Sequence, residues 1–281
     1  MLQTRDVDGG WVVTPSARWV RYSRRDGREG FGALDDDGGV VVHDGDMFES
    51  PEPSGERVTL ADLELLAPTQ PTKIVGLWNN LRAATEKFGW STPGEPLYFI
   101  KPTSSVLAPG ATVRRPSSYQ GRIVYEGELG VVIGRRCVDV AVDDVDDVVF
   151  GYTCVNDVTA LDLITEDESF AQWTRAKSFD TFAPLGPVIA TGVDPDRLHV
   201  TTLVGAKPRQ DYDVSDMIFS PRQLVSLVSR GMTLMPGDVI ACGTSLGAMP
   251  MRPGVRIDVQ IDGIGVLSNE LGAETRAERA S

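Results

Sequence analysis

The sequence predicts a β-rich mixed α+β fold in two parts, a small β-rich N-terminal domain over residues 1–66 and a larger domain over 67–281. Three observations support this prediction. A hairpin signal of Asp and Gly lies between apolar runs at 30–34 and 40–43, and strand patterns dominate from Val188 onward. Between the two parts, 49–56 is polar and contains proline, which is typical of a linker. We therefore expect the boundary between Glu49 and Pro71.

The elements follow from local patterns. In the first part, 11–13 and 18–22 are short apolar segments that precede the hairpin. In the second part, the apolar, β-branched or alternating segments predict strands at 73–78, 97–100, 124–134, 200–204, 209–212 and 257–261. A hairpin turn at Asp262-Gly263 follows the last of these and leads to 264–266. A helix is expected over 81–88, capped by Asn79 or Asn80 and ended by Gly89, and another begins at Ser220-Pro221. Residues 150–161 are predicted to be a strand that runs into a helix, and 172–182 a loop or broken helix.

The strand predicted over 124–134 contains two carboxylates, Glu126 and Glu128, within an otherwise apolar run. Side chains at i and i+2 of a strand point the same way, so both acids share one face. Two half-buried carboxylates are costly unless a cation or a shared proton compensates them, and a hard divalent metal takes oxygen ligands. The alternative is an edge strand with both acids on its solvent face. Spacing alone leaves both possibilities open.

Composition narrows the class of partner. The formal net charge of −13 argues against nucleic acid or an anionic membrane, so we expect a small-molecule partner. No signal sequence or run of apolar residues long enough to span a membrane is found. The three cysteines match no metal or redox spacing and suit a reducing cytoplasm. Only His43 and His199 are present, which excludes a zinc site with several histidines.

Several further motifs occur in series. They are Tyr-Glu-Gly-Glu-Leu at 125–129, Gly-Tyr-Thr at 151–153 with Asn-Asp-Val at 156–158, Arg-Ala-Lys-Ser-Phe-Asp-Thr at 175–181, Pro-Leu-Gly-Pro at 184–187, Leu-Met-Pro-Gly-Asp-Val-Ile at 234–240 and Gly-Thr at 243–244. In identity and order this set resembles the fumarylacetoacetate hydrolase family over about 71–272, and the N-terminal part is similar to the small variable domain that many members carry.

The resemblance implies a β-roll or sandwich of the family's type and a homodimer. It also implies Mg²⁺ or Mn²⁺ held by Glu126, Glu128 and Asp157, although Asp157 on spacing alone could equally be a helix N-cap. Lys177 falls on the family's active-site lysine. Gln210 and Thr244 fall on positions that commonly touch the oxygens of the substrate.

One departure concerns the water-activating pair of the family's hydrolases, Asn-Tyr-x-x-His-x-x-Glu. Glu86 is present as a candidate general base, but Ala83 stands where the histidine is expected. The resemblance implies a metal-dependent enzyme that acts on a 2-oxo or 1,3-dioxo acid through a metal-bound enolate, with carbon-carbon bond hydrolysis as the first expectation. An isomerase or tautomerase, a decarboxylase or a dehydratase is the alternative. A metal-binding homologue without catalysis is the alternative from another class.

Overall fold

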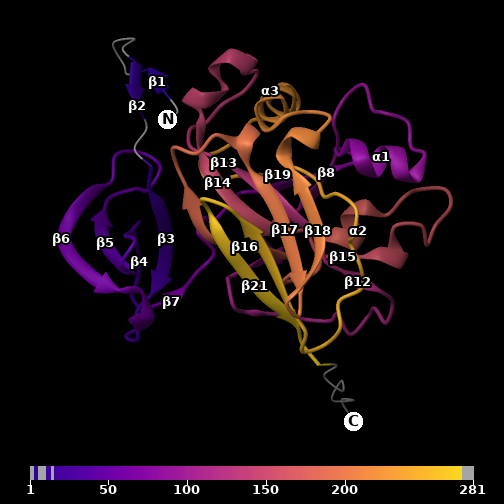
Figure 1. Cartoon of the computed structure of the whole chain (residues 1–281), viewed down its shortest axis with the longest axis horizontal. Helices are drawn as coiled ribbons and strands as arrows, with labels where there is room; N and C mark the ends of the chain where they lie inside the picture. Colours follow the sequence, from indigo (N-terminus) through magenta and orange to yellow (C-terminus); the bar gives the residue numbers. More distant parts are fainter. Residues whose placement is uncertain (1–2, 6–10, 14–15, 274–281) are drawn as a thin grey trace.

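Two β-sheets make up most of the computed structural model, which describes residues 3–5, 11–13 and 16–273. The β-rich α+β prediction is confirmed, and the small N-terminal β domain lies beside the larger part (Figure 1). The boundary at residues 66 and 67 stays a prediction. The tail 274–281, for which the sequence predicts fraying, lies outside the described residues.

The larger sheet joins both parts of the chain, because β3 of the N-terminal domain pairs with β16 of the larger part through Trp19 and Ile189. In spatial order its strands are β6 (Glu52–Thr59), β5 (Gly39–Asp44), β4 (Glu29–Leu34), β3 (Arg18–Ser23), β16 (Ala183–Ala190), β14 (Val149–Asn156), β13 (Gly127–Ile133), β19 (Val239–Ala241), β8 (Ile74–Trp78) and β9 (Leu97–Lys101). Two short strands flank this path, β7 (Glu64–Leu65) beside β3 and β10 (Val106–Leu107) beside β16.

The second sheet packs against the first. Its order is β11 (Thr112–Val113), β21 (Gly265–Leu271), β20 (Arg256–Ile261), β17 (His199–Val204) and β18 (Lys207–Asp213). The smaller pairs are β1 (Gln3–Arg5) with β2 (Trp11–Val13) and β12 (Ile123–Val124) with β15 (Thr159–Ala160). The α-helices are α1 (Arg82–Phe88), α2 (Trp173–Lys177) and α3 (Pro221–Gly231). Short 3₁₀ segments lie at Leu60–Asp62, Thr103–Ser105, Val142–Asp147, Leu161–Leu163, Pro195–Arg197 and Val214–Asp216.

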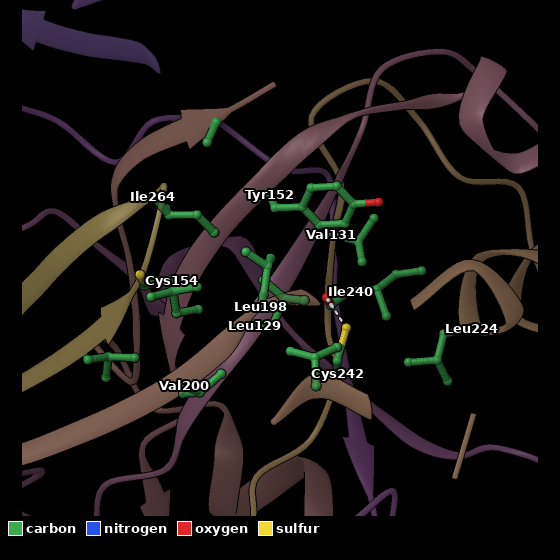
Figure 2. Close-up of a cluster of buried hydrophobic side chains, with 14 of the residues drawn as sticks. Leu129, Val131, Tyr152, Cys154, Leu198, Val200, Leu224, Ile240, Cys242 and Ile264 are labelled. Carbon is green, nitrogen blue, oxygen red and sulfur yellow. Dashed lines mark hydrogen bonds between the residues drawn. The ribbon is translucent and has the colours of Figure 1, made fainter. Parts of the chain in front are cut away.

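A hydrophobic core fills the space between the two sheets and α3 (Figure 2). Strand β13 contributes Leu129 and Val131 to it, and the facing strand β17 contributes Val200. Leu224 reaches the same core from α3. Because alternate side chains of a strand point to opposite faces, Glu128 points away from this core.

The predicted helix ends are confirmed where the residues that form the cap lie close together in the chain. Ser220 and Gln223 form the reciprocal capping box at the start of α3, and Gly89 ends α1 in the left-handed conformation. Asn79 and Asn80 do not cap α1, because Leu81 stands at the cap. Asn80 instead donates to the carbonyl oxygens of Phe219 and Cys242, far along the chain.

Two other predictions are wrong. The segment expected to be a linker contains most of β6, which pairs with β5. The side chains of β6 are mostly exposed, so its sequence shows no apolar alternation. Pro53 is tolerated because β6 is an edge strand. The strand β14 does not run directly into a helix, because β15 and a 3₁₀ turn follow Asp157. Asp157 is therefore not an N-cap. None of the helices in the described ranges is long and apolar enough to cross a membrane.

Buried Asp238 fixes the start of β8 to the turn before β19. Its Oδ1 accepts from the backbone N–H and hydroxyl of Thr72 at 2.8 and 2.7 Å, and its Oδ2 accepts from the N–H of Met235 at 2.9 Å and from Lys73 Nζ. We expect Asp238→Asn to lower the free energy of unfolding by about 2–3 kcal/mol, because buried donors lose a charged acceptor. Denaturant unfolding measures this, with exposed Asp262→Asn as the control. Equal stabilities of the two variants would contradict it.

Candidate active site

Three carboxylates meet at the end of β13. Carboxylate oxygens of Glu126, Glu128 and Asp157 all lie within 4.8 Å of one another. The antiparallel pairing of β13 with β14 sets Gly127 opposite Asn156, and the N–H of Asp157 donates to the carbonyl of Glu126 at 2.8 Å. The solvent-face alternative for the acid pair is excluded, since Glu128 is fully buried and the side chain of Glu126 is 17% exposed.

Gly127 separates the two glutamates because β17 approaches too closely for a side chain. A Cβ on Gly127 would lie 2.0 Å from Thr202 Oγ1. We expect Gly127→Ala to destabilise the fold by about 1–3 kcal/mol through overpacking, and to weaken metal binding by displacing both acids. Thermal unfolding with and without Mg²⁺ measures both effects. Gly94→Ala is the matched control because its Cβ would meet nothing within 4 Å. Adding Thr202→Ala should restore part of the loss; no recovery would contradict the steric explanation.

Two lysines neutralise part of the acid cluster. Lys177 Nζ donates to Glu126 Oε2 at 2.8 Å and to Asp157 Oδ2 at 2.5 Å. Lys101 Nζ donates to Asp157 Oδ1 at 2.5 Å and to the carbonyl of Val158 at 3.2 Å. Both ammonium groups are buried. Together they bond both carboxylate oxygens of Asp157.

Burial and the charges of the cluster shift the pKa values of four of its groups. Burial, together with the charges of Asp157 and Glu126, raises the pKa of Glu128 well above that of a free carboxyl. Burial would also raise the pKa of Asp157, but Lys101 and Lys177 outweigh it and lower that pKa. Burial would lower the pKa of Lys177, but the three carboxylates outweigh it, so Lys177 is held protonated. The pKa of Lys101 is lowered by its burial, against the attraction of Asp157.

The donor set fits a hard divalent cation. Glu128 Oε2 accepts from the N–H of Gly243 at 2.8 Å, whereas buried Glu128 Oε1 has no hydrogen-bond partner. A buried carboxylate oxygen without a partner, beside two further carboxylates, is the arrangement that Mg²⁺ or Mn²⁺ satisfies. Thr159 orients the cluster by donating to Glu126 Oε1 at 2.7 Å.

A pocket of about 280 Å³ opens onto this cluster, slightly smaller than the roughly 300–1,000 Å³ typical of small-molecule sites. Glu126, Lys177 and Thr244 line it. Gln210 does not line it but lies buried behind, where its amide nitrogen donates to Thr244 Oγ1 at 2.7 Å and its oxygen accepts from the N–H of Gly127 at 2.9 Å. Gln210 therefore positions the residues of the site in this structure.

The structure does not bring Glu86 to the acid cluster. Its side chain is exposed on α1 and is absent from the described lining of the pocket. Both histidines lie elsewhere: His43 packs on Trp19 with ring centroids 4.9 Å apart, and His199 bonds Asp211 and Asp213 at the surface.

Sequence reasoning missed Lys101, Thr159 and Gly243 as members of the site. A signal for Lys101 did exist, because it ends the apolar strand 97–100, where an unpaired lysine would be costly. Thr159 and the N–H of Gly243 carry no comparable signal, since their role depends on partners 33 and 115 residues away.

Comparisons with known proteins agree with this geometry. Residues 73–272 match the family model described as fumarylacetoacetate (FAA) hydrolase C-terminal, and 17–68 match the one described as Rv2993c-like, N-terminal. The chain is 39% identical over 228 residues to oxaloacetate tautomerase YisK of Bacillus subtilis, covering 76% of this chain and 75% of that protein.

Solved structures give the same result. The crystal structure of 2-hydroxyhepta-2,4-diene-1,7-dioate isomerase from Mycobacterium marinum is similar with a TM-score of 0.84 and 35% identity, covering 92% of this chain and 100% of that one. Fumarylpyruvate hydrolase from Pseudomonas aeruginosa, in complex with Mn²⁺ and pyruvate, is similar with a TM-score of 0.67 and 31% identity over 74% of this chain and 91% of that one. The chain therefore belongs to the fumarylacetoacetate hydrolase family of enzymes.

Proposed function

We propose that this protein is a divalent-metal-dependent tautomerase that interconverts the keto and enol forms of a 2-oxo acid. The observation that carries the proposal is the pocket itself, in which protonated Lys177 lies beside the acid cluster while Glu86 lies outside. The B. subtilis and M. marinum relatives, whose names denote a tautomerase and an isomerase, support it. Hydrolysis, the first expectation from the sequence, has less support than this alternative.

Glu126, Glu128 and Asp157 would hold Mg²⁺ or Mn²⁺. The bound metal would supply a Lewis acid for the carboxylate and adjacent carbonyl of the substrate. Enolisation breaks a C3–H bond: its proton passes to a water molecule, its electrons form the C2=C3 double bond, and the carbonyl oxygen takes up a proton from solvent. Lys177, held protonated and lining the pocket, would donate a hydrogen bond to that oxygen as negative charge develops on it.

Other residues keep this donor and the acids in place. Lys101 holds Asp157 from the side opposite Lys177, and Thr159 holds Glu126. Gln210 fixes Thr244 at the pocket wall. Such support matters because a small displacement of catalytic groups costs a large part of the rate.

Hydrolysis would require one further component, a positioned acid-base pair that activates water. Ala83 replaces the histidine of that pair, and neither His43 nor His199 lies at the pocket. Tautomerisation does not need the pair, which is why we place it first. The cytoplasmic location and the homodimer stay predictions.

Incubation of the purified protein and Mg²⁺ with enol oxaloacetate tests the proposal. The ultraviolet absorbance of the enol should decay faster than in buffer, while NMR shows an unchanged carbon skeleton, and chelation of the metal should remove the acceleration. Release of CO₂ would indicate a decarboxylase instead. Cleavage of acylpyruvates to pyruvate and an acid would indicate a hydrolase. If the protein accelerates the reaction of no 2-oxo acid, it is a metal-binding homologue without catalysis.

A further inference from the structure

A chain of aromatic rings, the aromatic end of the pocket, runs from Phe99 beside Lys177 to Trp90. Trp78 on β8 lies between Trp90 and Trp173, with ring centroids 5.1 and 5.6 Å away, and Phe99 stacks on Trp173 at 5.8 Å with an interplanar angle of 10°. All four rings line the same pocket as Glu126 and Lys177. The pocket therefore has one charged end and one aromatic end.

Helix α2 supplies a residue to each end. Trp173 and Lys177 are four residues apart, so they lie on one face with Cβ atoms about 5–6 Å apart. Phe99 bridges them, since Lys177 Nζ lies 4.9 Å from the centroid of its ring. A molecule whose carbonyl oxygen meets Lys177 would thus place a substituent on its C3 against Trp173 and Phe99.

The aromatic end offers no cation to a second carboxylate. Among the described residues that line the pocket, Lys177 is the only cation, and it already bonds Glu126 and Asp157. The amide nitrogen of Asn79 is bonded to the carbonyl of Ser91, and its oxygen accepts from Thr85. A carboxylate placed here would lose its water without gaining a cation to pair with, which is unfavourable.

The charge of the acid cluster also suits a singly charged ligand. When all five groups are ionised, three carboxylates and two ammonium groups leave one negative charge, which a divalent cation would convert to one positive charge. A monocarboxylate would neutralise that charge, whereas a dicarboxylate would leave an excess in a buried site.

We propose that the substrate is a 2-oxo monocarboxylic acid with an uncharged aromatic group on C3, an arylpyruvate, rather than a dicarboxylic acid such as oxaloacetate. This inference rests on the proposed function and specifies its substrate class. The aromatic group would stack on Trp173 and Phe99, while the 2-oxo acid end faces Lys177 and the acids.

Exchange of C3 hydrogens with deuterated water, followed by NMR with Mg²⁺ present, compares phenylpyruvate with oxaloacetate in one assay. We expect kcat/KM to be at least about tenfold higher for phenylpyruvate, the scale of one well-placed aromatic contact. An equal or higher value for oxaloacetate would overturn the substrate class and leave the tautomerase intact. If neither compound exchanges, the proposed function fails. Quenching of tryptophan fluorescence then tests the substrate class by binding alone. Tighter binding of phenylpyruvate than of oxaloacetate supports the arylpyruvate class, and equal or weaker binding overturns it.

Trp173→Leu separates a contact with the substrate from an indirect effect on Lys177. We expect kcat/KM for phenylpyruvate to fall about tenfold, mainly through KM, with oxaloacetate changed much less. Equal losses for both substrates would mean that Trp173 only supports Lys177, which would overturn the contact. Trp19→Leu is the matched control, since Trp19 lies in the N-terminal domain and outside this pocket.

Discussion

Glu128→Gln should unfold at a higher temperature than the parent protein in metal-free buffer at mildly alkaline pH, and should lose the rise in melting temperature on addition of Mg²⁺. The buried carboxylate lies among like charges, and its Oε1 has no partner. A neutral amide removes that repulsion and keeps an oxygen for the N–H of Gly243, so we expect a gain of about 1–2 kcal/mol, typical of single stabilising substitutions. The proposed metal would lose one of its three carboxylate ligands.

The sign of the pH dependence follows from the raised pKa of Glu128. Between the pKa of an unfolded carboxyl and the raised pKa in the fold, the folded state binds more protons, so stability falls as pH rises through that interval. Metal binding needs the ionised form, so the stabilisation by Mg²⁺ should grow over the same interval. Differential scanning fluorimetry across pH measures both trends.

Exposed Glu270→Gln is the matched control and should behave as the parent protein does. If Glu128→Gln melts at a lower temperature than the parent protein without metal, yet its melting temperature still rises with Mg²⁺, Glu128 is not a ligand of the metal.

Lys177→Met should lower kcat/KM for keto-enol exchange by roughly 10²–10³-fold, the usual effect of losing one donor to a developing oxyanion. Methionine nearly preserves the volume of the buried side chain but removes the ammonium group. Mg²⁺ should bind at least as tightly as in the parent protein, because the acid cluster becomes more negative. Deuterium exchange measures the rate, and a Mg²⁺-dependent melting shift measures binding.

Exposed Lys207→Met on β18 provides the comparison for this substitution. A loss of less than about threefold would contradict the role of Lys177 as donor, since positioned groups usually contribute at least about 10²-fold. A lost response to Mg²⁺ would instead mean that Lys177 acts by organising the acids.

Local chemistry explains which parts of this molecule could be predicted from its sequence. The start of α3 at Ser220 and the hairpin of β4 and β5 depend on residues close in the chain, and the sequence predicts both. Strand β6 was missed because an exposed edge strand carries no alternating apolar pattern. The sequence predicts a local cap by Asn79 or Asn80, but the partners of Asn80 are Phe219 and Cys242, which lie more than a hundred residues away.

The residues of the site also divide into those that the sequence predicts and those that it does not. The resemblance correctly placed Glu126, Glu128, Asp157 and Lys177 near one another, because the motif order carries information that spacing alone lacks. The sequence could not indicate that α1 turns Glu86 outward, since that depends on how the helix packs. Nor could it indicate that Trp78, Trp90 and Trp173 come together from three separate segments.

The pairing of β3 with β16 gives the N-terminal domain a protective role toward the catalytic half. Without residues 16–66, the end of β16 at Ile189 and Ala190, which now pairs with β3, would be an exposed edge open to strands of other copies of the chain. Intermolecular pairing would then compete with folding, so a shortened enzyme would fail first by aggregation rather than by loss of chemistry.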